Sequence, residues 1–227
     1  MVLLLGREWT RADLMARLGR LDQVAGIELL EGGDGVERGV RQLHVRSGSG
    51  FELEILVDRA FDIGRANMAG VPLAWSSPVG ALAPWYYQSE GLEWFRGFPG
   101  GLLSTCGLDH MLLGGVDDAS HFDFPHRSTE TYGLHGRVTG LPARLVGYGT
   151  EWSGDEATFW AEGEIRQVAV FAEQLELRRR VEVPLGGRSV RVLDRVTNIG
   201  PTTCSHMMLY QCNIGWPIVE EGSFLVY

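Results

Sequence analysis

The stretch Glu173-Gln174-Leu175-Glu176-Leu177-Arg178-Arg179-Arg180-Val181-Glu182-Val183 alternates between apolar and charged side chains along most of its length. Leucine and valine at 175, 177, 181 and 183 share one face, and glutamate and arginine at 176, 178, 180 and 182 share the other. Successive side chains of a strand point to opposite faces, so this period of two predicts a long β-strand with one buried face. We interpret the arginine run 178–180 as a solvated strand face whose charges pair with glutamates.

Similar patterns elsewhere predict an all-β fold. Residues 145–152, 157–170, 189–197 and 205–214 read as strands, and shorter runs at 24–30, 41–46, 53–57, 62–68 and 71–75 are separated by glycine-rich turns. Thr10 can cap a short N-terminal helix, with Asp13 at its third position and leucines following at helical spacing. Many strands joined by turns indicate antiparallel sheets. With neither a linker nor a repeat, we expect a single domain over residues 1–227.

Residues 76–130 differ from the rest of the chain. They are rich in proline, glycine, aromatic and acidic residues and show little periodicity, and the only helical pattern lies at 91–95. A segment of this length without regular structure is usually functional in a compact domain. We therefore expect it to carry part of a functional site.

Composition limits the partners. The formal net charge of −9 argues against a nucleic acid or an anionic membrane as the main partner, because both attract basic surfaces. The three cysteines match no zinc pattern, and an odd count makes a poor disulfide framework. No apolar run approaches the roughly 20 residues that span a bilayer, and the apolar start of the chain is shorter than a secretory signal. We expect a cytoplasmic protein with reduced thiols and no cofactor.

Five motifs follow one another in a characteristic order. They are DRAFDIG at 58–64, PLAW at 72–75, GGLLSTCGL at 100–108, GLHGR at 133–137 and LYQCNIGWP at 209–217. This ordered set, which runs from near residue 50 to residue 225, resembles the aldose 1-epimerase (galactose mutarotase-like) superfamily, and in particular its bacterial DUF4432-type branch. The resemblance implies a galactose mutarotase-like β-supersandwich of antiparallel sheets that binds a small-molecule sugar in an open cleft.

The resemblance also implies interconversion of the anomers of a free aldose, an isomerase activity. The ring oxygen gains a proton while the C1 hydroxyl loses one, so the reaction needs a general acid and a general base. His135 matches the family histidine near the ring oxygen, and Gln211 stands where a second histidine is usual. Glutamine can hold a hydroxyl but cannot supply a proton at neutral pH. The family's base, a late glutamate, is expected beyond Tyr227, so we expect the domain to be incomplete at its C-terminal end.

The remaining candidate site residues are polar side chains in or beside the same motifs. Arg137 faces the same side as His135 in an extended segment, and its guanidinium suits paired hydroxyls or a carboxylate, although an ion pair with nearby acids is an equal alternative. Likewise, Arg59 either binds substrate or locks a sheet end through an ion pair with Asp58. Cys106 has no partner base at a suitable spacing and is not expected to be a nucleophile. The candidate substrate contacts are Arg59, Thr105, His110, Arg137 and Asn213.

Three functions therefore compete. The first is an aldose 1-epimerase-like enzyme, and the second is a non-catalytic carbohydrate-binding protein on the same fold, with catalysis lost through Gln211. The third is a metal-dependent sugar isomerase that would use a group of histidines and aspartates. The spacings of these residues match no zinc motif, and we assign no metal ligands. The group consists of His110, Asp117, Asp118, His121, Asp123, His126 and His135. A shortened sandwich would expose a sheet edge, which allows for a homodimer.

Overall fold

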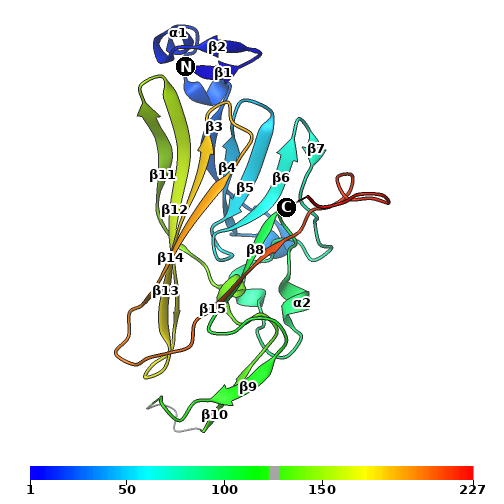
Figure 1. Ribbon diagram of the computed structural model, residues 1–227, viewed down its shortest axis with the longest axis vertical. Helices are drawn as coiled ribbons and strands as arrows, with labels where there is room; N and C mark the ends of the chain where they lie inside the picture. Colours follow the sequence, from blue (N-terminus) through cyan, green and yellow to red (C-terminus); the bar gives the residue numbers. More distant parts are fainter. Residues whose placement is uncertain (123–127, 227) are drawn as a thin grey trace.

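The computed structural model describes residues 1–122 and 128–226 and consists mainly of two antiparallel sheets (Figure 1). The larger sheet has the strand order β15-β8-β6-β5-β4-β3, with β7 paired to β6. Its strands are β3 (Gly26–Glu31), β4 (Arg41–Arg46), β5 (Phe51–Leu56), β6 (Asp62–Met68), β7 (Val71–Pro72), β8 (Leu103–Leu108) and β15 (Met207–Cys212).

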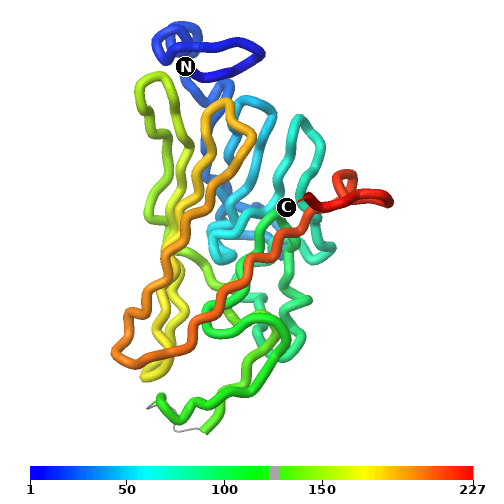
Figure 2. Tube along the Cα trace, in the orientation of Figure 1, coloured from blue at the N-terminus to red at the C-terminus, as the bar shows by residue number. Residues whose placement is uncertain are grey.

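The smaller sheet has the order β11-β12-β13-β14 and consists of long strands. These are β11 (Arg144–Ser153), β12 (Glu156–Val168), β13 (Gln174–Pro184) and β14 (Arg191–Asn198). One apolar core takes buried side chains from both sheets, so the two sheets pack face to face. The chain leaves the smaller sheet at the end of β14 and crosses to the larger one as β15 (Figure 2).

Smaller elements lie at the two ends of the sandwich. The N-terminal hairpin is followed by a short helix, and the β9–β10 hairpin projects at the opposite end of the molecule (Figure 1). These elements are β1 (Val2–Leu4), β2 (Arg7–Trp9), α1 (Arg11–Met15), α2 (Trp94–Gly97), β9 (Gly115–Asp118) and β10 (Thr129–Tyr132). Short 3₁₀ turns occupy Leu21–Gln23, Gly35–Glu37, Pro84–Tyr86 and Val138–Gly140. No helix among the described residues is long and apolar enough to span a membrane.

The strand predicted at 173–183 is confirmed as β13, with one correction. Leucine and valine at 175, 177, 181 and 183 are all buried, as the alternation predicts. Arg179 lies on this buried face and is 0% exposed, so the arginine run is not a uniformly solvated face. Its guanidinium donates to Asp62 at 2.8 Å and to Asp194 at 2.7 and 2.8 Å, and so joins β13 to both β6 and β14. Two carboxylates make this buried position tenable for a cation.

The N-terminal helix and the segment 76–130 differ in part from what the sequence predicts. The helix begins where expected, because the Thr10 hydroxyl accepts from the Asp13 backbone N–H at 3.0 Å, but it ends at Met15 and is shorter than the leucine spacing indicated. Residues 76–130 are not irregular throughout, since they contain α2, β8 and β9. Strand β8 was missed because both of its faces are covered, so its buried small and polar residues show no alternation. The sequence also reads as a strand at 223–227; residues 223–226 form no strand, and Tyr227 lies outside the described residues.

Candidate functional site

The strand pair β8–β15 carries the candidate site. Gln211 lies opposite Ser104, and Leu209 lies opposite Cys106. Directly opposed residues of an antiparallel pair share a face. Cys106 and Leu209 pack in a small apolar cluster with residues of α2 and its flanks, separate from the core between the sheets. The Gln211 side of this pair is therefore the outer face of the sandwich, and α2 lies beside it (Figure 1).

Strand β8 also positions His135. The Gly107 backbone N–H donates to the His135 carbonyl at 3.1 Å, and Gly107 bridges Gly136 in parallel register. The His135 backbone has φ 62°, in the left-handed region that side-chain-bearing residues seldom adopt. Its ring packs edge-on against the buried Trp94 ring, with centroids 4.7 Å apart. Such backbone strain persists only where the surroundings fix the residue firmly, and it concentrates at functional sites.

The loop around Leu112 sets the tautomer of His135. The Leu112 N–H donates to Nδ1 of His135 at 3.3 Å. A ring nitrogen that accepts a hydrogen bond is unprotonated, so Nε2 is assigned the proton of a neutral imidazole. Burial, and then the nearby His110, lower the pKa of His135. His135 is thus a neutral hydrogen-bond donor near pH 7, which suits holding a sugar oxygen better than protonating it.

Gln211 and Asn213 form the second polar group on this face. The Gln211 Nε2 donates to Asn213 Oδ1 at 3.1 Å, and the Asn213 Nδ2 donates to the Gly101 carbonyl at 3.0 Å. The buried Oε1 of Gln211 has no hydrogen-bond partner within the described part of the chain. A buried acceptor left unpaired costs about 1–3 kcal/mol, and a ligand hydroxyl would recover this once the amide turns Oε1 toward it.

His110 and Arg137 lie beside His135 but are already engaged. The His110 ring stacks on Tyr132, with centroids 4.9 Å apart, and its Nε2 is 2.7 Å from the Leu113 carbonyl. Arg137 forms ion pairs at 2.6 Å with Asp109, at 2.6 Å with Glu130 and at 3.6 Å with Glu173. Burial alone would lower the pKa of Arg137, but these carboxylates raise it. The ion-pair alternative therefore describes Arg137 in this structure.

Arg59 and Thr105 lie apart from these residues, inside the protein. Both side chains are 0% exposed. Thr105 donates its hydroxyl to Asp62 at 2.6 Å on the inner side of β8. Arg59 donates to three backbone carbonyls, those of Thr139 at 2.9 Å, Leu82 at 3.3 Å and Gly97 at 2.6 Å. The structure does not bring either residue to the outer face, and Arg59 instead fixes the loop that carries α2.

The metal and nucleophile alternatives have little geometric basis in the described residues. Within residues 1–122 and 128–226, no group of three or more His, Cys, Asp or Glu side chains could hold a metal ion. His126 and Asp123 of that hypothesis lie outside the described residues. Burial raises the pKa of Cys106 to about 12, so its reactive thiolate form is scarce at neutral pH.

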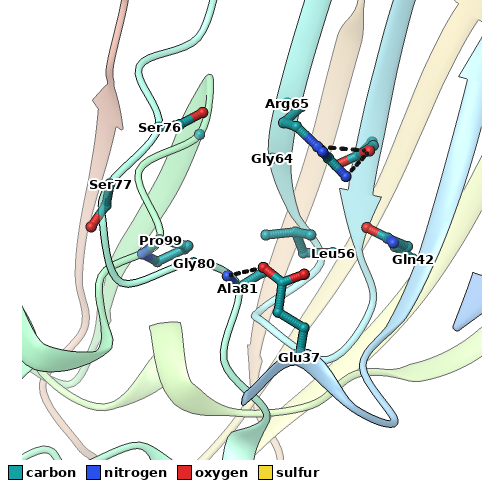
Figure 3. A pocket seen from close by; sticks show the side chains of 12 residues that line it. Glu37, Gln42, Leu56, Gly64, Arg65, Ser76, Ser77, Gly80, Ala81 and Pro99 are labelled. Atoms are coloured by element: carbon teal, nitrogen blue, oxygen red, sulfur yellow. Dashed lines mark hydrogen bonds and ion pairs between the residues drawn. The ribbon is translucent and has the colours of Figure 1, made fainter. Parts of the chain in front are cut away.

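A polar pocket farther along the same sheet face was missed by the sequence reasoning (Figure 3). Its volume is about 210 Å³, and its polar lining consists of Glu37, Gln42, Glu54, Arg65, Ser76 and Ser77. Glu54 could have been noticed as an outward residue of an alternating strand, and Arg65 follows directly after the motif at 58–64. Nothing in the sequence shows that the loops carrying Glu37 and Ser76 converge on them.

Comparison with solved structures defines the class of fold. The chain resembles the crystal structure of a candidate aldose 1-epimerase from Klebsiella pneumoniae subsp. pneumoniae, with a TM-score of 0.72 and 24% identity over 87% of this chain and 49% of the other. It also resembles a galactose mutarotase-like protein from Clostridium acetobutylicum, with a TM-score of 0.53 and 12% identity over 88% of this chain and 57% of the other. The chain thus has the galactose mutarotase-like fold and spans about half the length of these structures.

The family follows from the sequence match. Residues 37–227 match the model of the family described as domain of unknown function DUF4432, and the chain belongs to that family. No curated protein matches the chain. The resemblance read from the five motifs is therefore confirmed at the level of family and fold.

Proposed function

We propose that this protein binds a free sugar on the outer face of the β8–β15 pair. The observation that carries the proposal is the combination of the neutral His135 donor and the Gln211 amide, whose buried Oε1 lacks a partner in the described part of the chain, on the outer face of the sheet. Sugar hydroxyls both donate and accept hydrogen bonds, so they complement such a pair. The galactose mutarotase-like fold supports the same reading.

Interconversion of the sugar's anomers is the second candidate function. The position of His135 in its motif supports it, because a donor at this place could stabilise charge on the ring oxygen as the ring opens. The neutral His135 and the amide of Gln211 are both weak proton donors, however, so this chain lacks a strong acid at the two positions. We therefore infer that binding is the main activity and that any anomer exchange is slow.

The experiment is NMR of a panel of free aldoses with the purified chain, measuring both binding and anomer exchange. We expect line broadening of a bound sugar that His135→Ala removes, and exchange close to the buffer rate. The Gln211→His variant should raise the exchange rate, because it adds an acid with a pKa near neutrality. Arg191→Ala, an exposed position on the smaller sheet, is the matched control and should change nothing.

The outcomes separate the two candidates. Exchange well above the buffer rate in the parent chain, abolished in His135→Ala, would establish an isomerase and displace binding as the main activity. Failure of every aldose in the panel to bind would overturn the proposal, provided that the chain is folded by circular dichroism.

A further inference from the structure

The polar pocket of Figure 3 belongs to the same face as His135 and Gln211. On β5 the buried residues Leu53 and Ile55 point to the core, so Glu54 and Leu56, which line the pocket, point outward. Gly101 lines the pocket too, and its carbonyl accepts from Asn213 Nδ2 at 3.0 Å. One end of the pocket therefore meets the polar group of Gln211 and Asn213.

The local backbone aims a charged pair into this pocket. The register between β5 and β6 shifts between Leu53 and Ile55, so Gly64 and Arg65 both lie opposite Glu54. Such a β-bulge re-aims side chains and is common beside functional sites. Arg65 Nε lies 3.0 and 2.9 Å from the two carboxylate oxygens of Glu54, yet the Arg65 side chain remains 66% exposed. The guanidinium therefore keeps donors available to a ligand.

Glu37 completes the polar lining from the opposite side. It ends the 3₁₀ turn Gly35–Glu37, and its Oε1 accepts from the Ala81 backbone N–H at 3.1 Å. Figure 3 shows its carboxylate between Ala81 and the strands of the sheet. The pocket thus holds two carboxylates and one guanidinium, a balance that disfavours an anionic ligand group and suits hydroxyls.

The pocket and His135 are too far apart for one sugar ring. His135 is held at Gly107, Gln211 lies opposite Ser104, and the pocket begins at Gly101. The six residues from Gly107 to Gly101 cover about 20 Å of extended chain at roughly 3.3 Å each, whereas a six-membered ring of bonds near 1.5 Å is only about 3 Å across between opposite atoms. A ring at His135 therefore cannot also fill the pocket.

Aromatic side chains connect the two places. Trp75, which is 43% exposed, stacks on Phe98 with centroids 6.0 Å apart, and Phe98 stacks on Trp94 at 4.3 Å. Trp94 in turn contacts the His135 ring. The residue after Trp75, Ser76, lines the pocket. An exposed indole between two polar groups is a suitable platform for the apolar face of a sugar ring.

We propose that this pocket is a second subsite, which takes an uncharged glycosyl unit linked to the sugar held at His135 and Gln211. The preferred ligand is then a neutral disaccharide or longer saccharide, and not a single aldose or a sugar phosphate. The inference rests on the proposed function, because it places the first ring on the outer face of β8 and β15.

The test compares neutral disaccharides with their component monosaccharides by isothermal titration calorimetry. We expect at least one disaccharide to bind about tenfold more tightly than either component, or ~1.4 kcal/mol. Arg65→Ala and Glu37→Ala should remove this advantage and leave the monosaccharide affinity within about twofold, or ~0.4 kcal/mol. His135→Ala should weaken both ligands. Arg166→Ala is the matched control, since Arg166 is an exposed arginine paired with Glu164 and Glu176 on the other sheet.

Each contrary outcome has a distinct meaning. Equal affinities for disaccharides and monosaccharides, unaffected by Arg65→Ala, would overturn the second subsite. A monosaccharide affinity that falls with Arg65→Ala would show that the pocket is the only sugar site, and tighter binding of a sugar phosphate than of its neutral parent would refute the charge argument. If no saccharide of any length binds, the proposed function itself fails.

Discussion

Leu112 and His135 exchange two hydrogen bonds. The His135 backbone N–H donates to the Leu112 carbonyl at 2.8 Å, and the Leu112 N–H donates to Nδ1 of the His135 ring at 3.3 Å. Leu112 itself is in the left-handed region, with φ 65°, and its side chain is 55% exposed. A surface loop therefore determines which nitrogen of the site histidine carries the proton.

The partial burial of His135 predicts an acid-shifted titration. Burial lowers its pKa, so the ring should become charged only below the usual value of about 6.5. The unfolded chain then binds more protons between the two values, and the free energy of unfolding should rise with pH through this range. Sugar binding should be constant above the folded-state pKa and change below it, when Nδ1 gains a proton and expels the Leu112 N–H.

The measurement is ¹⁵N NMR of histidine-labelled protein as a function of pH, with His135→Gln to assign the signal. The Nε2–H tautomer and a pKa below the usual value of about 6.5 are expected for His135. A titration above 6.5, or an Nδ1–H tautomer at neutral pH, would contradict the assignment.

We expect Arg179→Ala to lower the free energy of unfolding by a large amount. Its replacement by alanine leaves the buried carboxylates of Asp62 and Asp194 without their cation, and breaking a buried ion pair costs about 3–5 kcal/mol. Urea unfolding followed by tryptophan fluorescence measures the change. Arg178→Ala, one residue along and on the exposed face, should leave the free energy of unfolding nearly unchanged.

A milder variant keeps this prediction testable if Arg179→Ala does not fold. Tyr210→Phe removes the hydrogen bond that the Tyr210 hydroxyl donates to Asp194 at 2.7 Å. One such bond to a charged group contributes about 1.5–3 kcal/mol. Unfolding midpoints identical to the parent for both variants would show that the network contributes nothing to stability.

The thiols should react in a fixed order. Cys212 is exposed and Cys106 is buried, and burial raises the pKa of Cys106 to about 12. Because the thiolate is the reactive form, a disulfide reagent at pH 8 should modify Cys212 first and Cys106 only after unfolding. Mass spectrometry of the modified peptides gives the order, and Cys212→Ser should remove the fast phase. Modification of Cys106 in the folded chain at a rate near that of Cys212 would contradict this burial.

The sequence predicts those parts of the fold in which one face of a strand meets water. The strands at 41–46 and 173–183 alternate, and each was placed almost to its ends. Strand β8 was missed because Thr105 faces the inner ion network while Cys106 faces the outer aromatic cluster, so it lacks a polar side. Arg179 was misjudged for a related reason, since one of its two partners, Asp62 of β6, is distant in sequence.

The candidate site was only partly readable. The motifs indicated His135, Gln211 and Asn213, and the structure places Gln211 and Asn213 together and holds His135 against Gly107 of the neighbouring strand β8. Arg65 was missed because its direction depends on a β-bulge, which alternation cannot reveal. The tautomer of His135 was equally inaccessible, since it depends on a hydrogen bond from a loop 23 residues earlier.

Arg59 fixes the backbone of the long segment before β8, which has little regular structure of its own. This one side chain donates hydrogen bonds to the backbone carbonyls of Leu82, Gly97 and Thr139, as a neighbouring strand would do at the edge of a sheet. The loop is held at two points, Leu82 and Gly97, with residues 83–96 between them. Within that segment the Gly91 carbonyl accepts from the Leu134 backbone N–H at 2.8 Å, so one buried side chain on the core side helps to set the position of the backbone beside His135.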